Sequence, residues 1–263
     1  MNLAEPFLAV IGSMDSSGGA GINQDIRVAA FMGFQLQTCV AALSLQDSDG
    51  LKAIYPVDLM VFQAGLEELL ENPSLKYLKI GALGNSVQMQ LLLDGLSHEQ
   101  QFPVILDPVI KASRGLKFVD DEGLPLLRAL AARADFVCPN LPELELLTQS
   151  RIGTIDEAIQ AAQAYCEAHG TTILVKGGHA KGTTLQEALV SPHSVSRFSS
   201  IKQNWSYTHG TGCALATAFM CYLAQGESPE TAFQSASAWV RNYYQGLNSH
   251  LIPAYPDTLM IRS

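Results

Sequence analysis

Residues 7–21 read FLAVIGSMDSSGGAG, a short apolar run that leads into a loop with three glycines. The run has the length of a buried strand, and the glycines allow the backbone to turn sharply into a helix. Similar short runs recur along the chain, and longer segments of helical period separate them. The expected strands are residues 7–11, 38–43, 77–80, 104–106, 136–138 and 172–175, and the expected helices are residues 57–71, 86–96, 122–133 and 155–169. This alternation is typical of a parallel sheet covered by crossover helices.

The C-terminal third of the chain has a different pattern. Between residues 183 and 201, Thr, Val, Ser and Phe alternate with polar residues, which predicts antiparallel strands at the edge of the sheet. A helix is expected over residues 212–225, ending at Gly226, and the last helix begins at Ser228-Pro229-Glu230. Because the chain has no internal repeat and no linker rich in Pro, Gly or Ser, we expect residues 1–263 to form a single α/β domain.

The composition argues against several classes of protein. Of the 263 residues, 48% are apolar and 16% are charged, so the chain can bury a full core. The formal net charge of −9 repels nucleic acid and anionic lipid, and we expect neither nucleic acid nor membrane as a partner. Five cysteines without zinc-site spacing indicate reduced thiols and a cytoplasmic location. Residues 1–6 lack a signal-peptide pattern and no apolar run reaches about 18 residues, so we expect a soluble protein.

Glycines and polar residues follow most of the expected strands. In sheets of this type ligands bind beyond the carboxyl ends of the strands, so these segments are the candidate site. They are residues 15–21 (DSSGGAG), 81–84 (GALG), 107–108 (DP), 140–143 (NLPE) and 176–179 (KGGH). The loop at 18–21 matches neither of the common nucleotide-binding glycine motifs, and an ordinary tight turn between strand and helix explains it equally well.

The strongest local signal is residues 208–216, THGTGCALA, in which a glycine-rich turn leads into an alanine-rich helix. Successive N–H groups at such a helix start favour an anion. Cys213 lies at that start, where we expect a lowered thiol pKa and a thiolate that acts as base or nucleophile. A buried structural cysteine is the alternative. We expect the other cysteines to be core residues and assign no chemistry to four of the histidines: Cys39, Cys138, Cys166, Cys221, His98, His169, His193 and His250.

Oxygen ligands follow two successive strands. Asp107, Asn140 and Glu143 are of the kind that holds Mg²⁺ near a phosphate. The alternative is that Asn140 caps a helix and Glu143 completes a capping box. Lys176 follows an apolar strand and precedes two glycines, which fits a contact with a nucleotide phosphate. The alternative is a solvated side chain, which is the more common role of an isolated lysine.

Taken together, these motifs resemble the hydroxymethylpyrimidine and hydroxymethylpyrimidine phosphate kinases of thiamin biosynthesis, which belong to the ribokinase-like superfamily. The resemblance spans about residues 7–245. It is carried, in this order, by residues 15–22 with Asp25, residues 79–81 (KIG), 107–109 (DPV), 140–143 (NLPE), 176–179 (KGGH) and 208–213 (THGTGC).

The resemblance implies a three-layer α/β/α fold with a central, mostly parallel sheet, ATP and Mg²⁺ as cosubstrates, and usually a homodimer. It implies that Cys213 is the catalytic base, where most of the wider superfamily has Asp, and that Gly210, Gly212 and Lys176 stabilise the transferred phosphoryl group. By the same resemblance, the nucleotide would contact Asn140, Glu143, Lys176, Thr208, Thr211 and Gly212; the pyrimidine would contact Gly19, Asp25, Gln46, Ala82 and Val109; and the metal would contact Asp107 and Glu143.

The chain departs from the family pattern near the expected substrate pocket. Ser13 stands where the family usually has Gly, Met14 stands where it has a small hydroxyl residue, and Ala82 stands where it commonly has Met. Residues 47–49 (DSD) replace a more usual Asn-Thr and a basic residue, which places extra negative charge near the mouth of the pocket. The sequence motifs therefore define the type of reaction better than they define the shape of the substrate.

The sequence predicts an ATP-dependent kinase that phosphorylates 4-amino-5-hydroxymethyl-2-methylpyrimidine and then its monophosphate. The nearest alternative is a pyridoxal or pyridoxine kinase, because both substrates are flat heteroaromatic rings that bear a hydroxymethyl group. A ligand-binding homologue with weak catalysis is the other alternative, and the presence of Lys176, Asn140, Glu143 and Cys213 argues against it.

Overall fold

The computed structural model describes residues 6–47, 50–96, 100–111, 115–177 and 184–249. Its strands are β1 (Phe7–Asp15), β2 (Leu36–Asp47), β3 (Gly50–Pro56), β4 (Leu75–Ile80), β5 (Val104–Leu106), β6 (Phe136–Val137), β7 (Thr172–Lys176), β8 (Thr184–Ser191) and β9 (Ser194–Ile201). Its helices are α1 (Gly21–Phe31), α2 (Leu59–Leu70), α3 (Ser86–Gly95), α4 (Gly123–Arg133), α5 (Leu141–Thr148), α6 (Ile155–His169), α7 (Thr211–Ala224) and α8 (Pro229–Ser249).

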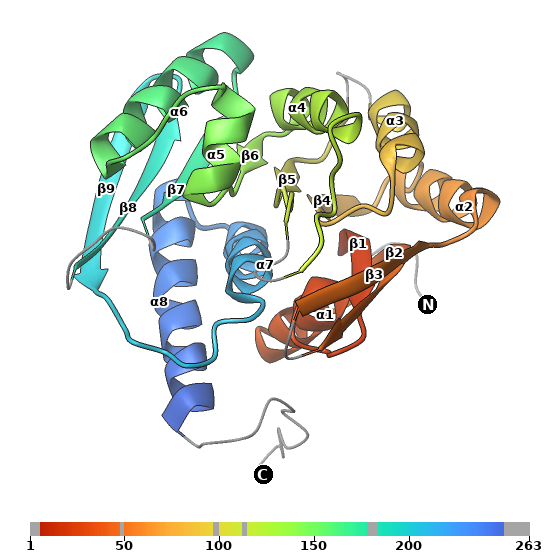
Figure 1. Ribbon diagram of the computed structural model, residues 1–263, viewed down its shortest axis with the longest axis horizontal. Helices are drawn as coiled ribbons and strands as arrows, with labels where there is room; N and C mark the ends of the chain where they lie inside the picture. The colour runs from red at the N-terminus through yellow and green to blue at the C-terminus, as the bar shows by residue number, and fades with distance from the viewer. Residues whose placement is uncertain (1–5, 48–49, 97–99, 112–114, 178–183, 250–263) are drawn as a thin grey trace.

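The described strands form one nine-stranded sheet in the order β3-β2-β1-β4-β5-β6-β7-β8-β9 (Figure 1). From β2 to β7 all neighbours are parallel, whereas β3, β8 and β9 are antiparallel to their neighbours. The carboxyl ends of six parallel strands therefore lie along one edge of the sheet, which is where a doubly wound fold places its ligands.

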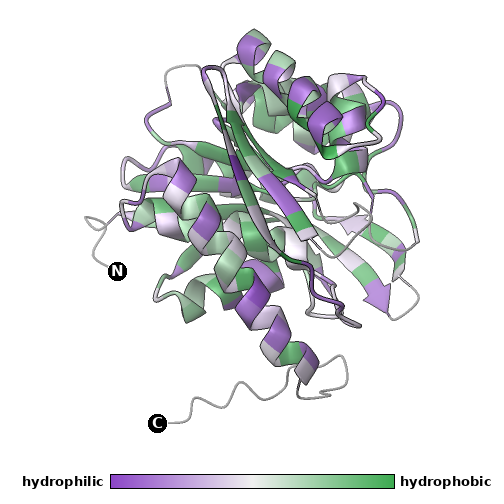
Figure 2. Cartoon of the chain, turned by 90° about the vertical axis from the view of Figure 1, so that its left-hand side faces the viewer, coloured by the Kyte–Doolittle hydropathy of each residue, from purple (hydrophilic) through white to green (hydrophobic). Residues whose placement is uncertain are grey.

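Alternating side chains of β1 divide the interior into two apolar clusters. Ala9 and Ile11 belong to the cluster that packs against α2 to α6, and Leu8 and Val10 belong to the cluster that packs against α1, α7 and α8. A strand buried on both faces is hydrophobic at every position, which explains the continuous apolar run at the start of the chain. Figure 2 shows hydrophobic residues between sheet and helices and hydrophilic residues on the outer helix faces. The expected α/β/α layering is confirmed.

All six strands and four helices expected from periodicity are present, as are the edge strands β8 and β9 and the last two helices. The strands β1 and β2 extend past their expected ends to Asp15 and Asp47, because the end of β1 still pairs with β2 up to Ser44 and the end of β2 pairs with β3. Sequence analysis missed β3, a short strand between Gly50 and Pro56 that forms an antiparallel edge with β2. Among the described helices, none combines the length and apolar character that crossing a bilayer requires.

Candidate active site

The start of α7 meets the ends of two strands at the ligand-binding edge. A Cβ atom on Gly212 would lie 3.7 Å from Nζ of Lys176 and 3.8 Å from Oδ1 of Asp107. Lys176 ends β7 and Asp107 directly follows β5, so the structure brings together three residues that the sequence places far apart. Because Gly212 has no side chain, a space remains between the Lys176 ammonium, the Asp107 carboxylate and the first N–H groups of α7. Such a space suits an anion together with a cation bound to it.

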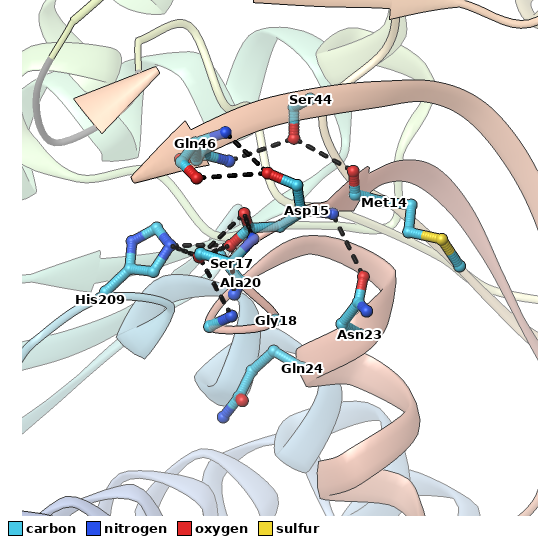
Figure 3. A network of polar contacts seen from close by, with 12 residues as sticks. Met14, Asp15, Ser17, Gly18, Ala20, Asn23, Gln24, Ser44, Gln46 and His209 are labelled. Carbon is cyan, nitrogen blue, oxygen red and sulfur yellow. Dashed lines mark hydrogen bonds and ion pairs between the residues drawn. The ribbon is translucent and has the colours of Figure 1, made fainter. Parts of the chain in front are cut away.

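Asp15, the last residue of β1, organises the glycine loop that follows (Figure 3). Its buried carboxylate accepts hydrogen bonds of 2.9 Å from the N–H groups of Ser17 and Ala20, and Nε2 of His209 lies 2.8 Å from Oδ2. Burial alone would raise the pKa of Asp15, but the hydrogen bonds from His209 and Ser17 outweigh burial and lower it. Asp15 is therefore an ionised anchor for the loop.

The glycine loop contacts the turn before α7 backbone against backbone. A Cβ atom on Gly210 would overlap the carbonyl oxygen of Gly19, and a Cβ atom on Gly19 would overlap the imidazole ring of His209. Gly210 also has a φ of 77°, in the left-handed region that favours glycine. Gly210 was predicted to stabilise the phosphoryl group and Gly19 to contact the pyrimidine, and the structure places these two glycines in contact.

Helix α8 supports the same turn from behind. The hydroxyl of Tyr244 donates a hydrogen bond of 2.7 Å to the carbonyl of His209. The side-chain amide of Asn248 pairs with both backbone groups of Tyr207, at 2.9 Å and 3.0 Å. Tyr207 and Trp205 stack on the Tyr244 ring. These contacts hold the backbone that leads to Gly210, the N-cap residue of α7.

Cys213 is half-buried in the first turn of α7, and the expectation of a lowered thiol pKa is wrong. Burial raises the pKa of the Cys213 thiol, and this effect outweighs the opposing influence of the Lys79 ammonium and of the Gly21 N–H. A helix start favours the thiolate, but desolvation disfavours the charged form of any thiol and is the stronger effect here. The other four cysteines are buried among apolar residues, as expected.

Glu143 and Asn140 form the capping box that the sequence left as an alternative. Oδ1 of Asn140 accepts a hydrogen bond from the N–H of Glu143 at 2.9 Å, and Oε2 of Glu143 accepts one from the N–H of Asn140 at 2.8 Å. Burial raises the pKa of Glu143 to about 7, despite the opposing charge of Lys176, and the Asp107 carboxylate adds to the rise. The cap uses one carboxylate oxygen and leaves the other for a further ligand.

Asp107 has an unused ligand atom. Its carboxylate is 3% exposed, and its buried Oδ2 has no hydrogen-bond partner. A buried oxygen without a partner is costly unless a cation or donor occupies the adjoining space. Within the described ranges, no group of three His, Cys, Asp or Glu side chains has metal-binding geometry. Asp107 and Glu143 would therefore need phosphate oxygens or water to complete a coordination shell.

The predicted substrate residues fall into two groups. Ala82 and Val109 are half-buried at the strand ends, and Gln46 is half-buried on β2 with Nε2 donating a 3.1 Å hydrogen bond to Ser44 (Figure 3). Asp25 is instead inside the protein, 1% exposed, with Oδ1 2.6 Å from Nζ of Lys79. Its expected place on a pocket wall is therefore not what the structure shows, because its carboxylate serves a buried ion pair.

Two unusual residues of the pocket contact each other. The Ser13 hydroxyl donates a hydrogen bond of 3.0 Å to the carbonyl of Ala82, and Ser13 is 2% exposed. The Ser13 side chain thus contacts the backbone of Ala82, so two positions at which the chain departs from the family pattern are neighbours. Thr208 and Thr211 flank the turn, where the N–H of Thr211 contacts the carbonyl of Thr208 at 3.3 Å. Of the predicted motifs, residues 48–49, Gly178 and His179 lie outside the described residues.

Sequence analysis gave no role to His209 or Lys79. His209 lies within the glycine-rich motif, but its partner Asp15 is 194 residues away, and no spacing rule connects them. The sequence around Lys79 could have indicated a buried ion pair. Lys79 is a charged residue in the strand LKYLKI, whose last three residues are all buried. A lysine in a fully buried strand position requires a counter-ion.

The chain resembles known proteins over most of its length. The family model described as phosphomethylpyrimidine kinase matches residues 15–251. The thiamine biosynthesis multifunctional protein ThiED of Corynebacterium glutamicum is 34% identical over 237 residues, 89% of this chain and 31% of that protein, so the chain spans about a third of that relative's length. The hydroxymethylpyrimidine/phosphomethylpyrimidine kinase of Haemophilus influenzae is 29% identical over 245 residues, 91% of each chain.

A solved structure supports the same placement. The pyridoxal kinase of Bacillus subtilis, solved as an ADP complex, superposes with a TM-score of 0.80 at 26% identity and covers 89% of this chain and 90% of its own. The expected ribokinase-like architecture is thereby confirmed. Because the family model matches nearly the whole chain and its motifs gather at one edge of the sheet, this chain belongs to the phosphomethylpyrimidine kinase family.

Proposed function

We propose that this protein, as a single domain, transfers the γ-phosphoryl group of ATP to the hydroxymethyl group of 4-amino-5-hydroxymethyl-2-methylpyrimidine and then to its monophosphate, in thiamin biosynthesis. The observation that carries the proposal is the meeting of Asp107, Lys176 and the start of α7 around Gly212. The Haemophilus influenzae relative, matched over 91% of both chains, is named for both phosphorylation steps.

The nucleotide side is formed by Lys176 and the first turn of α7. The Lys176 ammonium would pair with a phosphate of ATP, and the N–H groups of residues 210–213 would stabilise the charge that develops on the transferred phosphoryl group. Thr208, Thr211 and Asn140 are the further residues that would contact the nucleotide. The ADP complex of the Bacillus subtilis pyridoxal kinase supports a nucleotide site in this fold.

The residues present fit Mg²⁺. Asp107 supplies a buried oxygen without a hydrogen-bond partner, and Glu143 has one carboxylate oxygen beyond its capping contact. These two residues would hold the ion, which in this class of reaction neutralises charge on the phosphate oxygens. Burial raises the pKa of Glu143 to about 7, which disfavours its ionised form. A cation bound nearby would favour the ionised form.

Cys213 is the proposed base. Its thiol lies in the first turn of α7, one residue after Gly212, on the side where the phosphoryl group would transfer. The thiolate would take the proton of the substrate hydroxyl as its oxygen attacks phosphorus. Because burial raises the pKa of this thiol, the site needs a positive charge nearby for the thiolate to form.

Gln46 is the proposed selector for the pyrimidine ring. Its amide offers both a donor and an acceptor, which match the amino group and a ring nitrogen of an aminopyrimidine. The structural likeness to a pyridoxal kinase favours pyridoxal phosphorylation as the second candidate function. Pyridoxal does not present that pair of groups, so Gln46 favours the pyrimidine.

We also propose a homodimer and a cytoplasmic location. The β2–β3 edge and the start of α2 expose a group of large apolar side chains: Leu43, Leu45, Tyr55, Met60 and Val61, from 45% to 81% exposed. Exposed apolar groups of this kind mark interaction surfaces, and a second copy of the chain is the partner that we propose for this one. The five cysteines are free thiols, which fits a reducing compartment.

One assay separates the candidates. ADP release is measured with the pyrimidine, its monophosphate and pyridoxal, each at several concentrations, and with no acceptor as the control. The proposal expects the highest kcat/KM for the pyrimidine and measurable turnover of the monophosphate. Preferred turnover of pyridoxal would favour the second candidate, and no acceptor-dependent ADP release would favour a binding protein.

A further inference from the structure

Lys79 is a fully buried lysine at the ligand-binding edge of the sheet. It is the next-to-last residue of β4 and is 0% exposed. Its Nζ lies 2.6 Å from Oδ1 of Asp25 on α1, and the Thr217 hydroxyl on α7 donates a 2.7 Å hydrogen bond to the same oxygen. A Cβ atom on Gly81 would lie 4.0 Å from Nζ. One strand and two helices thus converge on a single ion pair.

The ion pair lies about one helical turn from Cys213. The backbone N–H of Gly21, the first residue of α1, favours the Cys213 thiolate electrostatically. Asp25 follows Gly21 by four residues and Thr217 follows Cys213 by four residues, which is about one turn along each helix. The Asp25–Thr217 hydrogen bond therefore joins α1 and α7 about one turn beyond Gly21 and Cys213, and Lys79 binds at that point.

Stability alone does not explain this ion pair. Removing two charges from water costs about as much free energy as their attraction returns, and apolar residues of similar volume are often equally stable. Asp25 outweighs the effect of burial and raises the pKa of Lys79, so the ammonium stays charged. The fold thus maintains a permanent positive charge close to the reacting end of α7.

We propose that Lys79 is a positioning residue whose buried ammonium stabilises the thiolate of Cys213. Use of that thiolate as the base rests on the proposed function, whereas the electrostatic relation between the two side chains does not. Without Lys79, burial and the negative groups around the Cys213 thiol would both raise its pKa. Lys79 is then the residue that makes proton removal by Cys213 feasible at the pH of the cell.

The charges around the thiol give the sign of the effect. Burial raises the pKa of Cys213; among the charged groups, Lys79 from β4 has the largest influence and lowers it, while Asp107 after β5 and Asp25 on α1 raise it. Tyr244 on α8 also interacts with the thiol and is neutral, since burial holds its pKa well above the usual value. The net influence of the Lys79–Asp25 pair is to favour the thiolate.

The test is the rate of iodoacetamide alkylation of Cys213 in the folded protein as a function of pH, followed by peptide mass spectrometry. This rate is proportional to the thiolate fraction. The double variant Lys79→Met/Asp25→Asn removes the pair without leaving an unpaired buried charge. We expect it to slow alkylation by at least about tenfold at pH values below the thiol pKa, the effect of losing a charge at short range. An unchanged or faster rate would overturn the proposal.

A second comparison separates the lysine from its counter-ion. Asp25→Asn alone removes the main group that keeps Lys79 charged, but the Cys213 thiolate also favours the charged lysine, so a proton on Lys79 can still accompany thiolate formation. Alkylation of Cys213 should therefore be faster in Asp25→Asn than in the double variant or in Lys79→Met, which have no amine at this position. Equal rates would overturn the proposal, and the comparison with Lys79→Met decides the question if the double variant does not fold. Folding of each variant is checked by its thermal unfolding transition.

Two controls separate charge from packing. Thr217→Val removes the hydroxyl that contacts Asp25 but no charge, and we expect alkylation within about twofold of the wild type. Lys76→Met makes the same lysine change at an exposed position of β4 and should have no effect. In urea all variants should react alike. The alkylation test does not depend on kinase activity. If the wild type were inactive on the pyrimidine in the ADP-release assay, the proposed function would be refuted and this inference would stand.

Discussion

Nε2 of His209 lies 2.8 Å from Oδ2 of Asp15, across 194 residues of chain. Asp15 ends the first strand and His209 precedes the N-cap of α7, so this contact joins the two glycine-rich segments of the site. Because Asp15 is ionised and accepts, His209 donates its Nε2–H. The two loops are therefore positioned together.

The first prediction concerns this anchor. The folded-state pKa of Asp15 is lowered, so the folded protein binds fewer protons than the unfolded chain as pH falls through the carboxyl range. The contribution of Asp15 is thus fully present above the ordinary carboxyl pKa and is lost in more acidic solution. We expect Asp15→Asn to lower the free energy of unfolding by about 1–3 kcal/mol near neutral pH, and by less in acid. Urea unfolding at several pH values measures this.

The matched control is Asp58→Asn, at the N-cap of α2, where Asn caps as well as Asp. We expect its unfolding free energy to stay within about 0.5 kcal/mol of the wild type. An Asp15→Asn loss that does not shrink in acid would show that Asp15 contributes by shape and not by charge.

The second prediction separates backbone strain from steric overlap at Gly210. Gly210 and Gly170 have similar left-handed φ values of 77° and 74°, but a Cβ atom would overlap Gly19 at the first and meet nothing within 4 Å at the second. Gly170→Ala should cost about 1 kcal/mol, the price of the backbone conformation alone. Gly210→Ala should cost clearly more and abolish ADP release. Equal unfolding free energies would contradict the close loop contact.

The third prediction tests Cys213 as the base. Cys213→Ala should lower kcat by at least about a hundredfold and leave the thermal unfolding transition intact. Cys221→Ala, a buried change two turns along α7, should lower stability and leave kcat nearly unchanged. Turnover of Cys213→Ala close to that of the wild type would remove the thiol from the reaction. Bound pyrimidine should slow inactivation by alkylation.

The fourth prediction distinguishes a metal ligand from a helix cap. Glu143 and Glu157 each complete a capping box, at α5 and α6, and only Glu143 lies near Asp107. Glu143→Gln should raise the Mg²⁺ concentration needed for half-maximal rate, whereas Glu157→Gln should leave it unchanged. If neither variant alters the Mg²⁺ dependence, Glu143 serves only as a cap.

Glu143 also predicts a pH dependence of stability. Its folded-state pKa of about 7 lies above the usual 4.5, so the folded protein binds more protons than the unfolded chain between these values. Its contribution to stability is present below pH 4.5 and is lost as pH rises to about 7. Glu143→Gln should flatten this part of the profile.

The fifth prediction concerns substrate choice. If Gln46 pairs with the aminopyrimidine, Gln46→Leu should reduce the ratio of kcat/KM for the pyrimidine to kcat/KM for pyridoxal by at least about tenfold. Ser44→Ala removes the hydroxyl that accepts a hydrogen bond from Gln46 and should give a smaller change in the same direction. Because the ratio compares two substrates of one enzyme, loss of active protein does not affect it. An unchanged ratio would assign selectivity elsewhere.

Sequence analysis predicted those parts of the site that depend on neighbours in the chain. The Asn140–Glu143 capping box was recognised as an alternative, because a cap and its partner are three residues apart. The meeting of Asp107 with Lys176 followed from topology, because parallel strands end at one edge of the sheet. The edge strand β3 was missed because its burial does not alternate: Leu51 is the one residue of this strand that is buried.

The alternation of strands and helices was readable from the sequence because buried strands and amphipathic helices impose short repeats of hydrophobicity, and those repeats decide the layers of this fold. Only the tertiary structure decided that Asp25 pairs with Lys79 instead of facing a pocket, and that the Cys213 thiol pKa is raised. Both depend on burial and on charges brought together from distant strands and helices. Desolvation and Coulomb energy are set by distances in space, and chain order does not contain them.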